Sequence, residues 1–220
     1  MTVALRARVY NDRMSATPAP QAEPRGRNRR GQGERLREEI VDSACRLLDE
    51  LADDQALSLR AVARDIGIAA TSVYLHFADR DALVLAALEH CHHGLVAAID
   101  VVEQAAAGNP VAQLRERTLV LGRWAHDHPG LYKVMHESTL NRRAAMAFKE
   151  EFGRLSRAAV QRCMDAGLAP ADDAAVVALD LRAAVHGAVS IRVNQPDLPW
   201  PPLEDQVDRF LVKLVGVKAP

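Results

Sequence analysis

This 220-residue sequence has few aromatic side chains, few cysteines and no long apolar run. Phe, Trp and Tyr make up 4% of the residues, and the cysteines, Cys45, Cys91 and Cys163, lie far apart inside apparent helices. That spacing suggests neither a disulfide framework nor a CxxC-type metal site, so we expect reduced thiols in the core. No apolar run approaches the about 18 residues of a membrane span, and Arg6 interrupts the first apolar stretch before a signal-peptide core could form. We therefore expect a cytoplasmic protein that has no membrane partner.

The residues that dominate the sequence are Ala, Leu, Val, Arg and Glu, and 49% of the chain is hydrophobic. Apart from Val, these side chains lose little freedom in a helix, and the apolar share is large enough to cover a core. The composition therefore predicts an all-α globular protein. The apolar spacing along the chain indicates about nine helices.

The charge is unevenly distributed, although the net charge is only −1. Residues 1–37 hold nine Arg against three acidic residues, a local balance of +6. Residues 15–33 are rich in Pro, Gly and Arg without an apolar period, so burial cannot offset their ordering entropy and we expect disorder in isolation. The arginines of this arm could enter a minor groove of DNA, but a solubilising tail is an equal alternative. They are Arg25, Arg27, Arg29 and Arg30.

Apolar residues recur three to four positions apart from Glu34 onward, which is the helical period. Cap and turn signals punctuate this pattern at Ser58, Gly67, Asp79 and Asn109–Pro110. The expected helices cover residues 34–51, 59–66, 70–77, 79–108, 110–126, 141–166 and 172–193, and a last one starts at 203. Between 128 and 141 we expect only a short turn over 131–136.

Residues 57–77 have the pattern of a helix-turn-helix. Such a motif needs a small residue where its helices cross, a glycine at the turn, and apolar residues that fix the crossing angle. Ala63 fills the crossing and Gly67 the turn. The residues that lock the angle are Val62, Ile66, Ile68 and Val73.

The run LSLRAVARDIGIAATSVYLHFADRDALVLAAL over residues 57–88 closely resembles the DNA-binding domain of the TetR family. That domain has a Gly-Val/Ile turn, a Tyr-x-His-Phe element and then a basic residue before the next helix. The resemblance extends over residues 36–88. HPGLYKVM at 128–135 and AAVHGAVSIRV at 183–193 are similar to a subgroup with an HPxxY/F element and a His-Gly pair, although Val185 stands where that subgroup often has Trp.

The resemblance implies a homodimer whose C-terminal domain binds a small molecule and then releases DNA. We expect a basic arm over 1–33, a helix-turn-helix domain over 34–80, and a ligand-binding and dimerisation domain over 81–220. The expected function is a ligand-responsive regulator, a repressor that binds a palindromic operator and is released by a small hydrophobic ligand. A TetR-like activator, or a scaffold without a ligand, is the alternative.

The residues expected to contact DNA lie around the second helix of the motif. Short hydroxyls there can donate to bases or phosphates, a methyl can touch thymine, and the Tyr and His resemble a phosphate-positioning pair of the family. Flanking arginines can bind phosphates on either side of the groove. Helix capping, core packing and ordinary solvated charge are the respective alternatives. The expected contacts are Arg60, Ala70, Thr71, Ser72, Tyr74, His76 and Arg80, with Arg27, Arg29 and Arg30 of the arm.

The second domain carries two further predicted sites. Large or polar-tipped side chains among small apolar ones could line a ligand cavity, although an ordinary core would look the same. These are Trp124, Tyr132, Met135, Phe148, Phe152 and His186. Small residues near 183–188 and an apolar stripe after 203 predict a dimer interface formed by the last two helices. Its expected residues are Ala184, Gly187, Ala188, Leu203, Val207, Phe210 and Leu214.

The cluster Glu89-His90-Cys91-His92-His93 invites a metal-site interpretation, but consecutive helical residues point about 100° apart. Only His90 with His93, and Glu89 with His93, share a face, so we expect no metal and no cofactor. An all-α enzyme that uses the histidines is a remote alternative. The sequence offers no nucleophile–base pair, phosphate loop or carboxylate-rich metal spacing, so we expect no enzyme.

Overall fold

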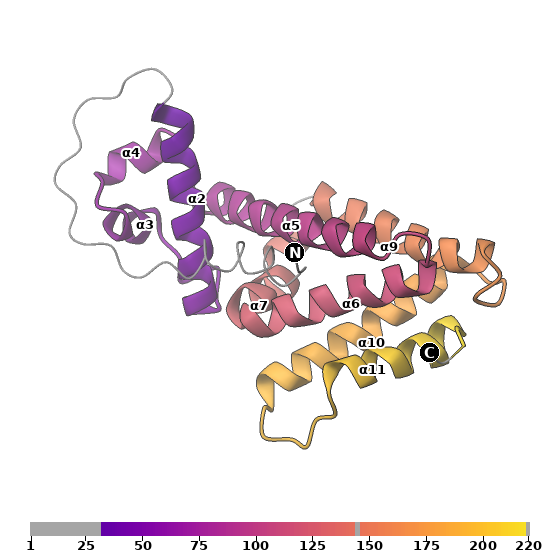
Figure 1. The fold of residues 1–220 in the computed structure, drawn as a ribbon. Helices are drawn as coiled ribbons and strands as arrows, with labels where there is room; N and C mark the ends of the chain where they lie inside the picture. The colour runs from indigo at the N-terminus through magenta and orange to yellow at the C-terminus, as the bar shows by residue number, and fades with distance from the viewer. Residues whose placement is uncertain (1–31, 144–145, 219–220) are drawn as a thin grey trace. The chain divides into compact units, whose positions relative to one another are not determined.

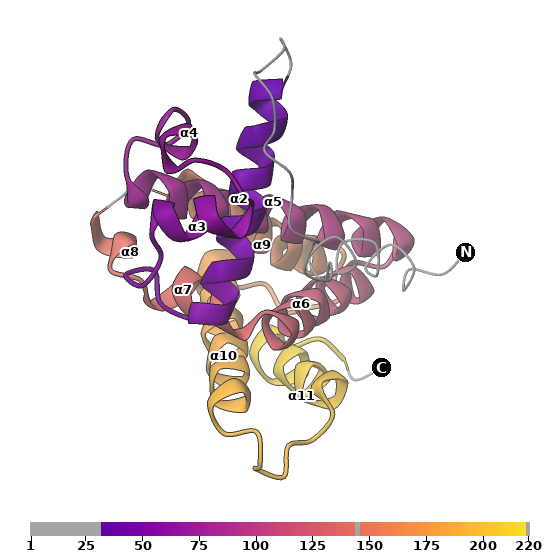
Figure 2. The same cartoon turned by 90° about the vertical axis from the view of Figure 1, so that its left-hand side faces the viewer.

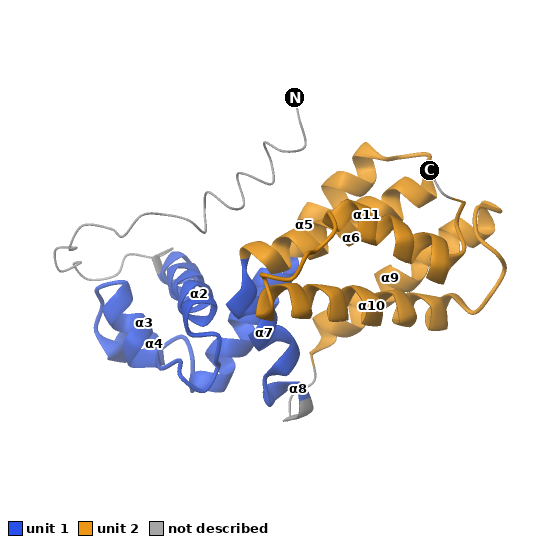
Figure 3. Cartoon of the chain, turned by 90° about the horizontal axis from the view of Figure 1, so that it is seen from below, with its two compact units in different colours: residues 1–94, 128–145 blue, residues 95–127, 146–220 orange. Residues whose placement is uncertain are grey.

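The computed structural model describes residues 32–143 and 146–218, and every regular element in these ranges is a helix. The predicted all-α fold is thereby confirmed. The chain divides into two compact units (Figure 3): unit 1 takes residues up to 94 and 128–145, and unit 2 takes 95–127 and 146 onward. Unit 1 therefore includes residues 128–145, beyond the 34–80 range expected for the DNA-binding domain.

Unit 1 is built around α2 (Gln32–Leu51), which packs against α3 (Leu59–Asp65) and α7 (Pro129–Glu137). The short α4 (Ala70–Tyr74) packs on α3, and α8 (Leu140–Arg143) contacts α7 (Figures 1 and 2). The first part of α5 (Arg80–Ala105) also belongs to this unit. In its core, the fully buried side chains of α2 follow the predicted spacing, and α3, α4 and α5 add further ones: Ile40, Ala44 and Leu48, with Val62, Val73, Leu83 and Leu88.

Unit 2 joins the second part of α5 to α6 (Pro110–Asp127), α9 (Ala147–Asp165) and α10 (Ala174–Asn194). The helices α9 and α10 pack on each other and α6 packs on both, while α11 (Leu203–Phe210) lies against α6 and α10. A π-helical turn, η1 (Leu211–Val215), extends α11 and ends at Gly216, whose φ is 77°. The core of this unit is apolar and includes Leu114, Leu119, Val160, Val207 and Leu211.

The predicted N-cap residues Ser58, Asp79 and Asn109 are found at the starts of α3, α5 and α6. The Ser58 hydroxyl accepts from the Ala61 N–H at 3.1 Å, and the Asp79 carboxylate accepts from the Ala82 N–H at 2.8 Å. The Asn109 side chain accepts from the Ala112 N–H at 3.0 Å, immediately before Pro110 opens α6. These side chains satisfy backbone donors that have no partner within their own helix.

Two helix predictions were wrong. Residues 129–137 form the helix α7 rather than a short turn over 131–136. The single helix expected over 141–166 is interrupted, because Met146 has the non-helical dihedrals φ −120° and ψ 80°. Nothing in the Ala- and Arg-rich sequence there stops a helix, but the chain passes from unit 1 to unit 2 at this point, and packing in each unit overrides propensity. The last helix changes to π-helical winding at Leu211.

A joint between α2 and α7 holds unit 1 together. One carboxylate oxygen of Asp49 accepts from the N–H groups of Gly130 and Leu131, at 2.9 and 3.0 Å. The other lies 3.0 Å from Nδ1 of the buried His128. At Gly130 the two backbones touch, since a Cβ there would lie 1.9 Å from the Asp49 carbonyl oxygen. Asp49 therefore caps the N-terminus of α7 at the point where Gly130 allows the two backbones to touch.

Two helices, α5 and α10, have the length and composition of a membrane span, and 44% and 39% of those stretches are buried. Core helices of a soluble protein have the same properties, so this observation is weak evidence for a membrane. Both helices contribute to the cores described above.

Candidate DNA-binding surface and ligand cavity

The geometry of the helix-turn-helix follows from three local features. Ser58 caps α3, and Gly67 ends the segment with φ 69°, a left-handed conformation that side chains with a Cβ rarely adopt. The Ile68 N–H then donates to the Ala63 carbonyl at 2.9 Å, which closes the turn. Ala63 is 3% exposed, as expected for the small residue at the crossing.

Helix α2 fixes the orientation of the motif. The Asp65 carboxylate at the end of α3 accepts from the Ser43 hydroxyl at 2.6 Å and from the Arg46 guanidinium at 2.8 Å. The Arg37 guanidinium carbon lies 5.1 Å from the centroid of the buried Phe77 ring, which follows α4. Both ends of the motif are thus attached to α2, so α4 presents a defined surface.

The predicted DNA-contact residues differ in exposure. Arg60, Thr71 and Tyr74 are exposed, and Tyr74 as a whole residue is 52% exposed. Three others, Ala70, Ser72 and His76, are half-buried. Arg80 is half-buried and donates to the adjacent Asp81 carboxylate at 2.8 Å. Arg27, Arg29 and Arg30 lie outside the described residues.

Sequence reasoning missed Leu75, which directly follows α4 and is 86% exposed. The signal was present: Val73 and Phe77 face the core, and a residue two positions from each must point away from it. An exposed apolar side chain next to Tyr74 offers van der Waals contact to a thymine methyl. The surface around α4 is therefore partly apolar as well as hydroxyl-bearing.

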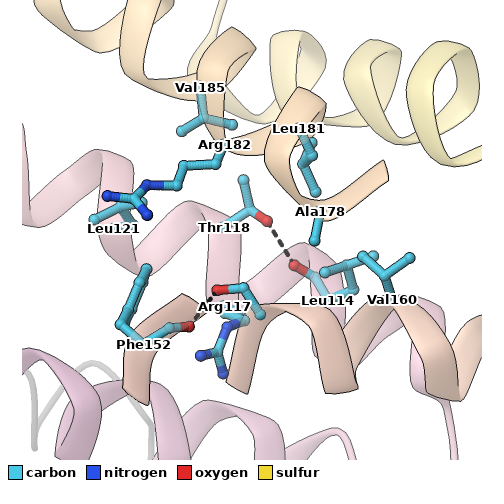
Figure 4. Close-up of a pocket in the computed structure, with 11 residues that line it drawn as sticks. Leu114, Arg117, Thr118, Leu121, Phe152, Val160, Ala178, Leu181, Arg182 and Val185 are labelled. Carbon is cyan, nitrogen blue, oxygen red and sulfur yellow. Dashed lines mark hydrogen bonds between the residues drawn. The ribbon is translucent and has the colours of Figure 1, made fainter. Parts of the chain in front are cut away.

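Unit 2 contains a cavity of about 40 Å³ between α6, α9 and α10 (Figure 4). Of the six predicted ligand residues, Phe152 lines it. Trp124 and Phe148 are buried elsewhere in unit 2 and His186 is half-buried there, whereas Tyr132 and Met135 belong to unit 1. On α7 the Tyr132 ring lies 4.4 Å from the His136 ring, centroid to centroid. The described residues therefore do not gather the six side chains around one cavity.

Two arginines that sequence reasoning missed line this cavity, Arg117 on α6 and Arg182 on α10. Arg117 is 6% exposed, donates to Glu103 at 2.8 Å, and has its guanidinium carbon 5.3 Å from the Phe152 ring centroid. The positive charge of Arg182 and, above all, burial lower the pKa of Lys149 to about 8. The signal in the sequence was a charged residue between Leu114 and Leu121, on the face of α6 that also carries Thr118.

The His/Cys cluster on α5 is divided between a surface ion pair and the core. His90 pairs with Asp42 at 3.3 Å, and this hydrogen bond raises the pKa of the imidazole. Cys91 points into the core, where its thiol donates to the Cys45 sulfur at 3.1 Å. Within residues 32–143 and 146–218, no group of three or more His, Cys, Asp or Glu side chains is placed to hold a metal ion.

The predicted dimer residues are distributed over α10, α11 and η1. Val207 and Ala188 are buried inside unit 2, at 1% and 8% exposure, so little of their surface is left for a partner. Leu214 is 37% exposed. The other four, Ala184, Gly187, Leu203 and Phe210, are half-buried.

Two family models match the chain. Residues 40–87 match the model described as "Bacterial regulatory proteins, tetR family", and residues 114–215 match "Tetracyclin repressor-like, C-terminal domain". A helix-turn-helix-type transcriptional regulator of Haemophilus influenzae is 48% identical over 54 residues, which is 24% of this chain and 26% of that protein. The matched segment is thus about a quarter of that relative's length.

Solved structures share the fold. A TetR family transcriptional regulator of Thermus thermophilus, PfmR, superimposes with a TM-score of 0.60 at 20% identity, over 80% of this chain and 96% of its own. SmeT, the repressor of a Stenotrophomonas maltophilia multidrug efflux pump, has a TM-score of 0.60 at 21% identity, over 80% and 88% of the two chains. FadR of Bacillus halodurans, a fatty acid degradation regulator, has a TM-score of 0.69 at 15% identity, over 86% and 97%.

The helix-turn-helix geometry, the two family models that together span both units, and the shared fold lead to one conclusion. The chain is a member of the TetR family of bacterial transcriptional regulators.

Proposed function

We propose that the protein is a ligand-responsive repressor that binds a palindromic operator as a homodimer and is released by a small molecule. Regulators of the TetR family bind DNA operators and small-molecule effectors, typically as dimers, and are soluble and normally cytoplasmic. The observation that carries the proposal is the exposed surface of α4, held on α2 through Asp65 and bearing Thr71 and Tyr74. An activator with the same surface is the second candidate.

The Thr71 hydroxyl and the Tyr74 phenol are suited to different parts of DNA. A short hydroxyl at the start of a recognition helix reaches base edges or phosphates, and a longer phenol reaches a phosphate oxygen. Arg60 and Arg80 add charge, which makes binding salt-dependent. Because few long side chains are available for bidentate base contacts, we expect modest discrimination by α4 itself, supplemented by the spacing of two half-sites.

Fluorescence anisotropy on a duplex enriched by the protein from a random library tests this surface. Tyr74→Phe removes one hydroxyl and Thr71→Ala another, and each should weaken binding by about 1 kcal/mol or more. Thr139→Ala, at an exposed threonine outside α3 and α4, is the matched control and should bind like the wild type. Equal affinities for all of these proteins would contradict the proposal.

The dimer interface that we propose is the outer face of α10. Val176, Leu179 and Ile191 are 53%, 62% and 44% exposed, and with Ala183 and Gly187 they follow a spacing of three to four residues. Such positions lie within one face of a helix, and a contiguous exposed apolar face marks an interaction site. The small residues in its middle permit close approach of a second helix.

Sedimentation equilibrium at micromolar concentration tests the interface. Leu179→Glu places a charge in the middle of the apolar face and should shift the protein to the monomer, because the buried charge would lack a partner. Leu51→Glu, at a 42% exposed leucine of unit 1, is the control and should remain dimeric. A monomeric wild type would overturn the proposal.

Two continuous stretches of chain connect the cavity helices to the DNA-binding helices. The helix α5 runs from unit 1 into unit 2, and α6, which lines the cavity, leads directly into His128 and α7. Through Asp49, α7 is joined to α2. A ligand that prefers one arrangement of α6 can shift the population of DNA-competent dimers through these connections. This mechanism requires the ligand to lower the affinity for the operator, and the operator to lower the affinity for the ligand, by the same factor. Independent binding of the two would contradict it.

A further inference from the structure

We propose that the effector is an organic acid, whose carboxylate binds Arg117 and Arg182 and whose apolar part occupies the cavity between α6, α9 and α10. This inference rests on the ligand-responsive function proposed above, and it names the chemical class of the ligand. It specifies that the small hydrophobic ligand expected from the sequence carries a carboxylate.

Arg117 is the first reason. The side chain is 6% exposed, and its Nη1 donates to Glu103 at 2.8 Å. Its Nε and Nη2 atoms are buried and have no hydrogen-bond partner in the described part of the chain. Leaving a charged donor buried without a partner is unfavourable, and a bound acceptor relieves that cost. Nε and Nη2 form one edge of the guanidinium, the edge that binds both oxygens of a carboxylate side by side.

The charge balance around the cavity is the second reason. Glu103 is shared, because Arg162 also donates to it, at 3.2 Å. The residues that line the cavity include Arg117 and Arg182 but neither Asp nor Glu. Burial, and secondly the positive charge of Arg182, lower the pKa of Lys149 to about 8. A bound anion would offset the positive charge of the cavity lining.

The hydroxyl groups in the lining do not compete with the arginines for an anion. The Thr118 hydroxyl donates to the Leu114 carbonyl at 2.7 Å, and the Ser156 hydroxyl donates to the Phe152 carbonyl at 2.9 Å (Figure 4). Both protons are thus used within their own helices. Among the lining residues, the buried donors that have no partner in the described part of the chain are those of the Arg117 guanidinium, which favour an anionic ligand over a neutral acceptor.

The rest of the lining is suited to an apolar body. It consists of Leu114, Leu121, Phe152, Val160, Ala178, Leu181 and Val185. About 40 Å³ accommodates a carboxylate and a few carbon atoms. A second hollow of about 330 Å³ between α9 and α10 shares Ser156, Ala178 and Arg182 with the cavity, so a longer ligand can extend past Arg182. That hollow carries Glu150 together with Arg154 and Arg157, and remains basic on balance.

Matched acid and amide probes test the inference on the full-length protein. Benzoate and octanoate are compared with benzamide and octanamide, which have the same shape without the charge, by thermal shift over a range of concentrations. We expect the acids to bind more tightly than their amides by about tenfold or more, the value of a charge-assisted hydrogen bond. Equal stabilisation by acid and amide, or no stabilisation by either acid, would overturn the proposal.

Variants locate the site. Arg117→Gln should remove the preference for acids, and Arg182→Gln, at a half-buried position that tolerates substitution more readily, should reduce it. Arg123→Gln is the matched control, because Arg123 is 51% exposed, pairs with Glu204, and lines a different hollow. An acid preference that survives in both Arg117→Gln and Arg182→Gln would place the acid elsewhere and contradict the proposal.

Operator binding separates this inference from the proposed function. If the protein binds its operator and is released by neutral compounds but not by acids, the repressor function stands and the acid assignment fails. If acids bind at Arg117 but leave operator affinity unchanged, the anion site stands and the ligand-responsive function fails. Acid-dependent release that is lost in Arg117→Gln supports both.

Discussion

The joint between α2 and α7 gives a prediction whose size follows from the structure. Gly130→Ala would place a Cβ 1.9 Å from the Asp49 carbonyl oxygen and 2.6 Å from its carbon. These are backbone atoms of α2, so no side-chain rotation relieves the contact. The joint must open until the atoms reach an ordinary separation of 3.4 Å or more. That movement strains the hydrogen bonds that the Gly130 and Leu131 N–H groups donate to Asp49, at 2.9 and 3.0 Å.

The expected cost is about 3 kcal/mol. Overpacking costs about 1–3 kcal/mol. Each weakened hydrogen bond adds about 1 kcal/mol, and the better helix propensity of Ala returns up to about 1 kcal/mol. For a chain of this size, such a loss lowers the melting temperature by about 6–12 °C. Thermal unfolding followed by circular dichroism at 222 nm measures it.

Gly153→Ala is the matched control. Gly153 also lies in a helix, but a Cβ there meets nothing within 4 Å. Its replacement should leave stability unchanged or raise it by up to about 1 kcal/mol, because Ala is the better helix former. If Gly130→Ala melts at or above the temperature of Gly153→Ala, the close approach of α2 and α7 is refuted.

Three further predictions concern the turn, the pH dependence and the thiols. Gly67→Ala, at φ 69°, should destabilise the protein by about 1 kcal/mol or more in urea unfolding, because a Cβ disfavours the left-handed conformation. Since the pKa of Lys149 is lowered from 10.5 to about 8, the unfolded state binds more protons between these values, so stability should rise with pH across that window. In Lys149→Met, the free energy of unfolding should lack this part of the rise when it is measured at about pH 8 and pH 10.5. The hydrogen bond from Cys91 and burial raise the pKa of Cys45. Iodoacetamide should therefore modify the Cys45 thiol slowly in the folded protein and rapidly in urea. Fast labelling of the folded protein would contradict the burial of Cys45.

Local signals in the sequence were sufficient for the helix-turn-helix. Ser58, Ala63 and Gly67 act through their own backbone and immediate neighbours, so their roles can be predicted without the tertiary structure. The exposed Leu75 could have been found in the same way from the buried Val73 and Phe77. Helix periodicity and caps are short-range properties, and they predicted the fold class and most helices.

The features that sequence reasoning missed depend on contacts between distant segments. The interruption at Met146 lies where the chain changes units, in a stretch of good helix formers. The α7 helix gains its N-terminal cap from Asp49, which lies 81 residues before Gly130 in the sequence and is therefore not a local signal. Arg117 was overlooked because its counter-ion, Glu103, lies on another helix, so the sequence could not show that the pair leaves two guanidinium donors in a cavity.

The central claim is that two copies of the α4 surface read DNA together. Selection from a random duplex library with the purified full-length protein, followed by sequencing, tests it most directly. The account predicts an enriched palindrome whose half-sites are about one helical turn, 34–36 Å, or a multiple of it apart, and predicts that Tyr74→Phe and Thr71→Ala weaken its enrichment. Enrichment of no sequence, or of a single unpaired site that neither substitution affects, would contradict the account.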